Sequence, residues 1–143
     1  MQGKRKESQP QWQPIAQLSL IARHIDSVVE SASEQYANLL QARPKPYVLD
    51  DYTLERVIAV FTTQQKDLWL FDEQLRRWKA DTLTGKQREE VERLVEQIAK
   101  LRQLIDSILH LTSELKEGTI EKQLAKSDEE LGLEFLLRHF PKQ

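Results

Sequence analysis

The sequence predicts an all-α protein, an antiparallel up-down-up bundle of three long helices with a shorter C-terminal helical segment packing on it or on a second copy. Two observations lead to this prediction. The 143 residues include only four Gly and five Pro, too few turn-forming residues for a many-stranded β fold. Within long stretches that lack both, apolar side chains recur at alternating steps of three and four residues, which is the spacing of a helical seam.

The first helix is predicted over about residues 14–42. Pro14 suits a first turn, and neither Gly nor Pro follows it until Pro44. Proline disfavours helical geometry in the residue before it and cannot donate a backbone hydrogen bond, so the helix ends before Pro44. The seam of this helix comprises Leu18, Ile21, Ile25, Val28, Ala32, Gln35 and Leu39.

The second helix is predicted over about residues 51–80. Asp50 is a favourable N-cap, and Leu49 and Leu54 have the spacing of a hydrophobic staple around it. The seam again steps by three and four, through Leu54, Val57, Phe61, Gln64, Leu68, Phe71, Leu75 and Trp78.

The third helix is predicted over about residues 85–117. Thr84 and Gln87 have the spacing of a capping box, and Gly118 is placed to end the helix as its C′ residue. Its seam comprises Val91, Leu94, Ile98, Leu101, Ile105, Ile108, Thr112 and Leu115. The short link from the second helix predicts antiparallel neighbours, and the link between the first two helices allows the same arrangement.

Two glutamines, Gln35 and Gln64, occupy seam positions that fall in adjacent layers of this bundle. An unpaired buried amide would cost about 1–3 kcal/mol. We therefore expect the two side chains to be a buried polar register pair, which forms a hydrogen bond across the helices or reaches a buried water.

The C-terminal segment is predicted to form helices over about residues 119–126 and 128–140, because Ser127 and Glu130 have the spacing of another capping box. The second of these carries more apolar side chains than one narrow stripe can hold: Leu131, Leu133, Phe135, Leu136, Leu137 and Phe140. Some of that surface must be covered, by the bundle or by a second copy of the chain.

A single domain is expected over residues 13–140, after a polar, basic and solvated tail over residues 1–12. No stretch approaches eighteen uninterrupted apolar residues, so a transmembrane helix is not expected. The chain has no Cys, which fits a reducing compartment. The expected location is the cytoplasm.

Familiar catalytic chemistry is missing from the sequence. It has no cysteine nucleophile, no glycine-rich phosphate loop and no Gly-x-Ser-x-Gly elbow. None of His24, His110 and His139 has Glu three residues before it, as a di-iron bundle requires. The acidic row Asp26, Glu30 and Glu34 lies off the seam. We expect no catalytic residue, no metal and no cofactor, and hence a protein that is not an enzyme.

The remaining features favour protein binding, with self-association into a homodimer and a protein partner that the sequence does not identify. The candidate interaction surface comprises Trp69, Leu70, Leu131, Leu133, Phe135, Leu137 and Phe140. Trp69 and Leu70 flank the seam residue Leu68 and cannot both lie on the seam, so either the C-terminal segment covers one of them or they anchor a partner.

The alternative is a nucleic-acid-associated regulator, although the net charge of −2 provides no overall attraction to nucleic acid. Basic side chains beside an aromatic can follow a phosphate backbone and stack on a base. The candidate basic patch comprises Arg76, Arg77, Lys79, Lys86 and Arg88.

Overall fold

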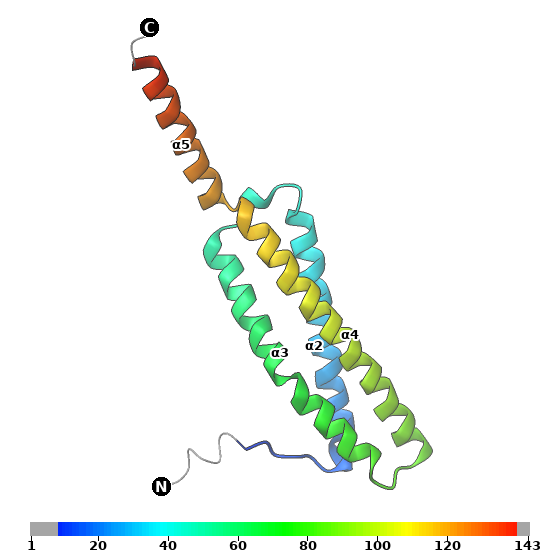
Figure 1. The fold of residues 1–143 in the computed structure, drawn as a ribbon. Helices are drawn as coiled ribbons and strands as arrows, with labels where there is room; N and C mark the ends of the chain where they lie inside the picture. The colour runs from blue at the N-terminus through cyan, green and yellow to red at the C-terminus, as the bar shows by residue number, and fades with distance from the viewer. Residues whose placement is uncertain (1–8, 140–143) are drawn as a thin grey trace.

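The computed structural model describes residues 9–139, except for the side chains of 127, 131, 134, 135, 138 and 139. This part of the chain is helical without a strand, and three long helices pack against one another, which confirms the all-α prediction. In chain order the elements are η1 (Ile15–Gln17), α2 (Leu18–Ala42), η2 (Pro46–Val48), α3 (Asp51–Lys79), α4 (Gly85–Leu115), η3 (Lys116–Gly118) and α5 (Ile120–His139). Figure 1 shows that α2 and α4 begin at one end of the bundle and α3 begins at the other.

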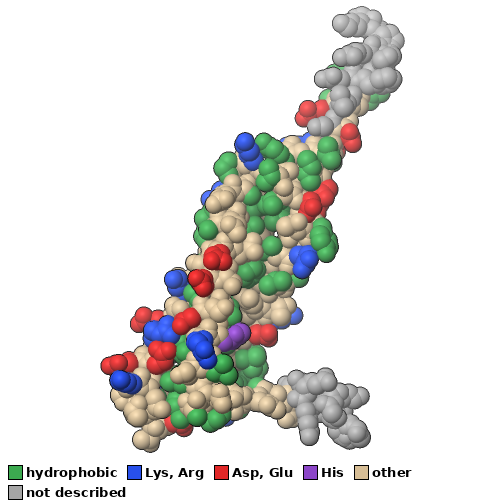
Figure 2. Space-filling model, turned by 180° about the vertical axis from the view of Figure 1, so that it is seen from behind, with side chains coloured by type: hydrophobic (Ala, Val, Ile, Leu, Met, Phe, Trp, Pro, Cys, Tyr) green, Lys and Arg blue, Asp and Glu red, His purple; other side chains and the backbone are tan. Residues whose placement is uncertain are grey.

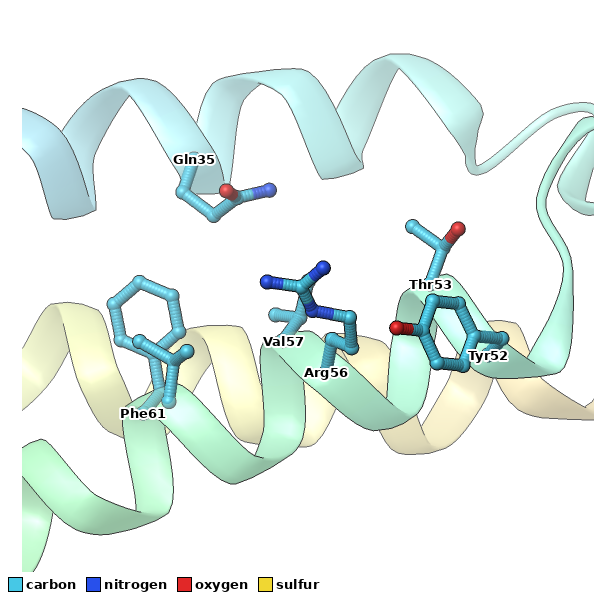
Figure 3. A pocket seen from close by; sticks show the side chains of 7 residues that line it. Gln35, Tyr52, Thr53, Arg56, Val57 and Phe61 are labelled. Carbon is cyan, nitrogen blue, oxygen red and sulfur yellow. The ribbon is translucent and has the colours of Figure 1, made fainter.

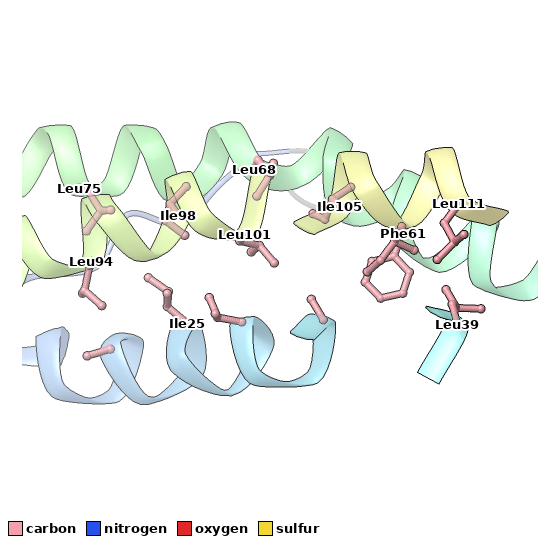
Figure 4. Close-up of a cluster of buried hydrophobic side chains, with 14 of the residues drawn as sticks. Ile25, Leu39, Phe61, Leu68, Leu75, Leu94, Ile98, Leu101, Ile105 and Leu111 are labelled. Carbon is pink, nitrogen blue, oxygen red and sulfur yellow. The ribbon is translucent and has the colours of Figure 1, made fainter. Parts of the chain in front are cut away.

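The helix α4 is the centre of the bundle. α2 and α3 each pack along α4 but make few direct contacts with one another. Every residue of the predicted α4 seam, from Val91 to Leu115, is at most 1% exposed. Figure 4 shows the side chains of α4 meeting those of α2 and α3, with Ile25 and Leu68 on the two flanking helices. The hydrophobic core is therefore organised around α4.

The predicted starts of the second and third long helices, which are α3 and α4, are capped by side chains. Asp50 accepts a hydrogen bond from the backbone N of Thr53 at 2.7 Å at the start of α3. At the start of α4, Gln87 N donates to Thr84 Oγ1 at 3.1 Å, and Thr84 N donates to Gln87 Oε1 at 2.9 Å. The predicted capping box is thus confirmed, and it satisfies backbone donors that a helix start leaves unpaired.

The C-terminal segment is a single helix. The predicted break between residues 126 and 128 is wrong, because α5 continues through Ser127 as far as His139. A serine inside a helix costs only a few tenths of a kcal/mol, so a capping pattern alone does not end one. Phe140 lies outside the described residues.

The junction before α5 also differs from the sequence prediction. Gly118 ends η3, and no described glycine has a positive φ, so Gly118 is not a left-handed C′ residue. From this junction α5 projects beyond the end of the bundle (Figure 1), and its main contacts are with η2 and η3. Over the described residues, no helix is long and apolar enough to cross a membrane.

Candidate protein-binding surfaces

An open groove separates α2 from α3, and the seam positions of both helices that border it are only half-buried. On α2, the positions Leu18, Ile25, Ala32 and Leu39 are buried. The seam positions between them are only half-buried, namely Ile21, Val28 and Gln35.

The seam of α3 also contains both buried and half-buried positions. Leu54, Phe61, Leu68 and Leu75 are buried. Three of the intervening positions are half-buried, namely Val57, Gln64 and Phe71. Each of the two helices therefore presents a second heptad row to the space between them. Figure 2 shows the molecule from behind, where hydrophobic side chains gather on the half of the body nearer α5.

The part of the groove nearer α5 is a depression of about 320 Å³. Figure 3 shows Gln35 entering it from α2, and Arg56, Val57 and Phe61 entering it from α3. Tyr52, Thr53 and Val60 complete its lining. Val60 is 49% exposed and Tyr52 is 66% exposed, so large apolar surfaces on this side of α3 face solvent.

A second depression of about 330 Å³ continues the groove toward the other end of the bundle. Its walls include His24 and Val28 from α2 and Leu70 and Phe71 from α3, and Leu101 of α4 contributes to its floor. The His24 and Phe71 rings are 6.0 Å apart between centroids. The two depressions together form a mostly apolar groove with few charged groups.

The predicted register pair does not form a direct hydrogen bond. Gln35 and Gln64 are both half-buried, but they line different depressions, and Gln64 Oε1 is buried without a hydrogen-bond partner. The two amides therefore lie at different positions along the groove. A water-mediated role for this pair stays a prediction.

The helix α5 exposes leucines along its whole length. Leu124, Leu133, Leu136 and Leu137 are between 48% and 64% exposed, and Ile120 is 38% exposed. Leu133, Leu136 and Leu137 share one helical face by their spacing, whereas Ile120 and Leu124 share a face on the opposite side. The helix therefore carries apolar surface on two sides. The side chains of Leu131 and Phe135 are outside the described part.

Trp69, an exposed aromatic residue of α3, contacts the N-terminal segment and not the C-terminal segment. Trp69 remains 53% exposed, and the Trp12 ring meets its edge at a centroid distance of 6.2 Å. The Arg77 guanidinium lies 4.5 Å above the Trp12 ring, in a cation–π contact. Leu70 is half-buried, and with Trp12 it lines a shallow hollow on this side. The expectation that the C-terminal segment covers one of Trp69 and Leu70 is wrong, because α5 extends away from them.

Backbone contacts hold the N-terminal segment in place. Gln13 N donates to Gln74 Oε1 at 2.7 Å, and the Gln74 Nε2 atom donates to Gln13 O at 3.2 Å. The indole Nε1 of Trp78 donates to the same carbonyl at 2.9 Å. Trp78 is therefore a core residue with its polar atom paired, as buried tryptophan requires.

The candidate basic patch is partly neutralised. Arg76 Nε donates to Glu73 Oε1 at 2.9 Å, and Arg77 Nε donates to Glu73 Oε2 at 3.0 Å. The hydrogen bond from Arg76, with that from Arg77, lowers the pKa of Glu73 to about 2. Lys79, Lys86 and Arg88 are exposed. Nucleic-acid binding by this patch stays a prediction, with two of its five cations already paired to a carboxylate.

Asp26, the first residue of the acidic row of α2, connects α2 to α4. Arg93 of α4 donates to both carboxylate oxygens of Asp26 at 2.9 Å, and Gln97 also donates to Asp26. The hydrogen bond from Arg93 lowers the pKa of the Asp26 carboxyl. Among the described residues, no group of three His, Asp or Glu side chains is arranged to hold a metal ion.

Sequence reasoning missed the groove residues Tyr52, Arg56 and Val60, which lie off the predicted seam of α3. Tyr52, Arg56 and Val60 follow one another at steps of four residues, so their spacing carried the signal that they share one face of the helix. The groove and the leucines of α5 are two apolar features that the described part of the chain leaves open. Comparisons with models of protein families, with curated protein sequences and with solved structures found no match to this chain.

Proposed function

We propose that this chain is a non-catalytic helical protein of the cytoplasm that acts by binding protein, and that it associates with a second copy of itself. The observation that carries the proposal is the exposure of α5. Leu133 and Leu137 are 58% and 64% exposed on a helix whose contacts with the rest of the chain lie at its first turns.

Helix physics supports this proposal. A helix of about 20 residues is only marginally stable in water, and most helical stability in proteins comes from packing of an apolar face. Within the part of the chain that the structure describes, α5 packs mainly on η2 and η3, and Glu121 and Lys122 of its first turn also contact Asp51 at the start of α3. Exposed apolar surface of this kind is typical of an interaction site.

Trp69 supports a further protein contact on α3. It is half-exposed beside Trp12 and Arg77, and tryptophan and arginine are the residue types most enriched at the energetic centres of interfaces. This site faces the other end of the bundle from α5, so it is available to a partner of a different kind.

Sedimentation velocity over a wide concentration range tests the self-association. The unaltered chain is expected to sediment as a dimer, and a Leu133→Asp/Leu137→Asp variant as a monomer, because a carboxylate buried without a partner is strongly unfavourable. Gln123→Glu, which adds a carboxylate at an exposed polar position of the same helix, is the matched control and is expected to remain dimeric. A monomer at every concentration for the unaltered chain would contradict the proposal.

A further inference from the structure

The groove between α2 and α3 has the form of a four-helix bundle that lacks one helix. In such a bundle each helix packs against two neighbours and buries both heptad rows of its seam. α4 does so, whereas the row of Val28 and Gln35 on α2 and the row of Val57 and Gln64 on α3 are only half-buried. Both rows line the groove, and Leu101 of α4 lies at its floor.

We infer that α5 of a second copy occupies this groove, so that two copies exchange their C-terminal helices and each completes a four-helix bundle. The inference rests on the proposed self-association and names the surface that receives α5. The groove is long enough for α5: it extends along α3 from Tyr52 to Phe71, and α5 has 20 residues, of which the first turn is held by its own bundle. At 1.5 Å per residue, each is about 30 Å long.

The start of α5 is held in a direction that takes it away from its own groove. Thr119 is fully buried, and its Oγ1 donates to Asp51 Oδ1 at 2.7 Å. Ile120 N donates to Leu49 O at 2.9 Å, and the Asp51 backbone N donates to Glu121 Oε1 at 3.0 Å. These contacts aim α5 beyond the end of the bundle (Figure 1), where a second copy can receive it.

A twofold axis accommodates the exchange. α5 leaves from the end of the bundle at which Tyr52 opens the groove. If two copies meet at these ends, each α5 enters the partner's groove at its Tyr52 end and runs parallel to α3. Each copy then donates one helix and receives one, which closes the assembly as an isologous dimer.

The chemistry of the two surfaces also matches. α5 carries apolar side chains on two opposite sides, which suits burial between two walls better than pairing along a single stripe. In the parallel orientation, the acidic run 128–130 of α5 lies toward the half of the groove that contains Arg56. Opposite charges at the rim of an interface select orientation and partner.

The inference is tested by mixing two variants that are each expected to be monomeric. Val60→Asp places a carboxylate in the groove at a residue that is 49% exposed, so the core of the monomer is preserved. Val95→Asp, at a 38% exposed valine of α4 outside the groove, is the matched control. Circular dichroism checks that each variant is folded, and sedimentation velocity measures its self-association.

We expect Val60→Asp to weaken dimerisation at least tenfold, as Leu133→Asp/Leu137→Asp does, and Val95→Asp to leave it unchanged. Mixing the Val60→Asp and Leu133→Asp/Leu137→Asp variants should restore a dimer, because the mixed pair retains one intact groove and one intact α5. If Val60→Asp dimerises normally while the α5 variant does not, or if mixing restores nothing, the exchange is overturned and self-association through α5 still stands. A monomeric unaltered chain would instead remove the proposed function and this inference together.

Discussion

Gly118 lies directly against the ring of Pro46: a β-carbon added to Gly118 would be 2.6 Å from Pro46 Cγ. The contact joins η3 to η2, the two short helices from which α5 departs. Because its φ is not positive, Gly118 is required for space and not for a left-handed backbone. The direction of α5 therefore depends on the absence of a side chain at this position.

Gly118→Ala is expected to destabilise the fold by about 1–3 kcal/mol, since η2 and η3 must separate to admit the methyl group. Gly85→Ala is the matched control, because no atom lies within 4 Å of a β-carbon added there. That substitution is expected to stabilise the protein by about 0.4–1 kcal/mol through the unfolded chain. Urea denaturation of both variants and of the unaltered chain measures the free energy of unfolding. Equal effects at the two glycines would show that the contact with Pro46 is unimportant.

Gln64→Leu is expected to stabilise the isolated bundle by about 1 kcal/mol, because it removes a buried Oε1 atom that has no hydrogen-bond partner and substitutes a side chain of similar size. For a chain of this length the thermal midpoint should rise by about 2–4 °C. Gln35→Leu, at the half-buried glutamine across the groove, should have a smaller effect. A lower midpoint for Gln64→Leu would indicate that the Gln64 amide does form a stabilising hydrogen bond in solution.

The hydrogen bonds of Glu73 with Arg76 and Arg77 predict how the stability of the fold changes at acidic pH. Hydrogen bonding to Arg76, and then to Arg77, lowers the pKa of Glu73 from 4.5 to about 2. A carboxyl whose pKa is lowered in the folded state stabilises that state above its ordinary pKa, and this contribution is lost as pH falls through the lowered value. Between about pH 4.5 and 2, the thermal midpoint of Glu73→Gln should therefore fall less steeply than that of the unaltered chain. Parallel curves for the two proteins would mean that the pair contributes nothing.

Gln74→Leu is expected to release the segment that contains Gln13, because the Gln74 side chain makes both an accepted and a donated hydrogen bond with the Gln13 backbone. Loss of about 1 kcal/mol of local stabilisation should speed hydrogen exchange of the Gln13 amide about fivefold. Gln65→Leu is the control, since Gln65 bonds only to Asp106 on an exposed surface. An unchanged Gln13 exchange rate in Gln74→Leu would show that the contacts of Trp78 with Gln13 and of Trp12 with Trp69 and Arg77 hold the segment without Gln74.

Residue patterns that span a few positions predicted the helices of the bundle more fully than they predicted how the helices pack together. The capping patterns at Asp50 and Thr84 act over three or four residues, so they could be recognised in the sequence and are present in the structure. The pattern at Ser127 has the same spacing, but α5 continues through it, because a serine inside a helix that is already formed costs little. A local motif therefore locates a helix start only where the preceding residues do not continue the helix.

The sequence by itself determined that this chain is helical and which heptad rows are apolar, because both properties follow from residue spacing along one helix. Only the tertiary structure decided which rows are buried. α4 buries every position of its predicted seam. α2 buries Ala22 and Val29 beside its seam instead of Val28 and Gln35, and α3 leaves Val57, Gln64 and Phe71 half-buried, because these side chains face the groove and not a neighbouring helix. The groove between α2 and α3 and the free course of α5 depend on contacts between residues distant in sequence, such as Thr119 with Asp51, and no periodicity within one helix encodes such contacts.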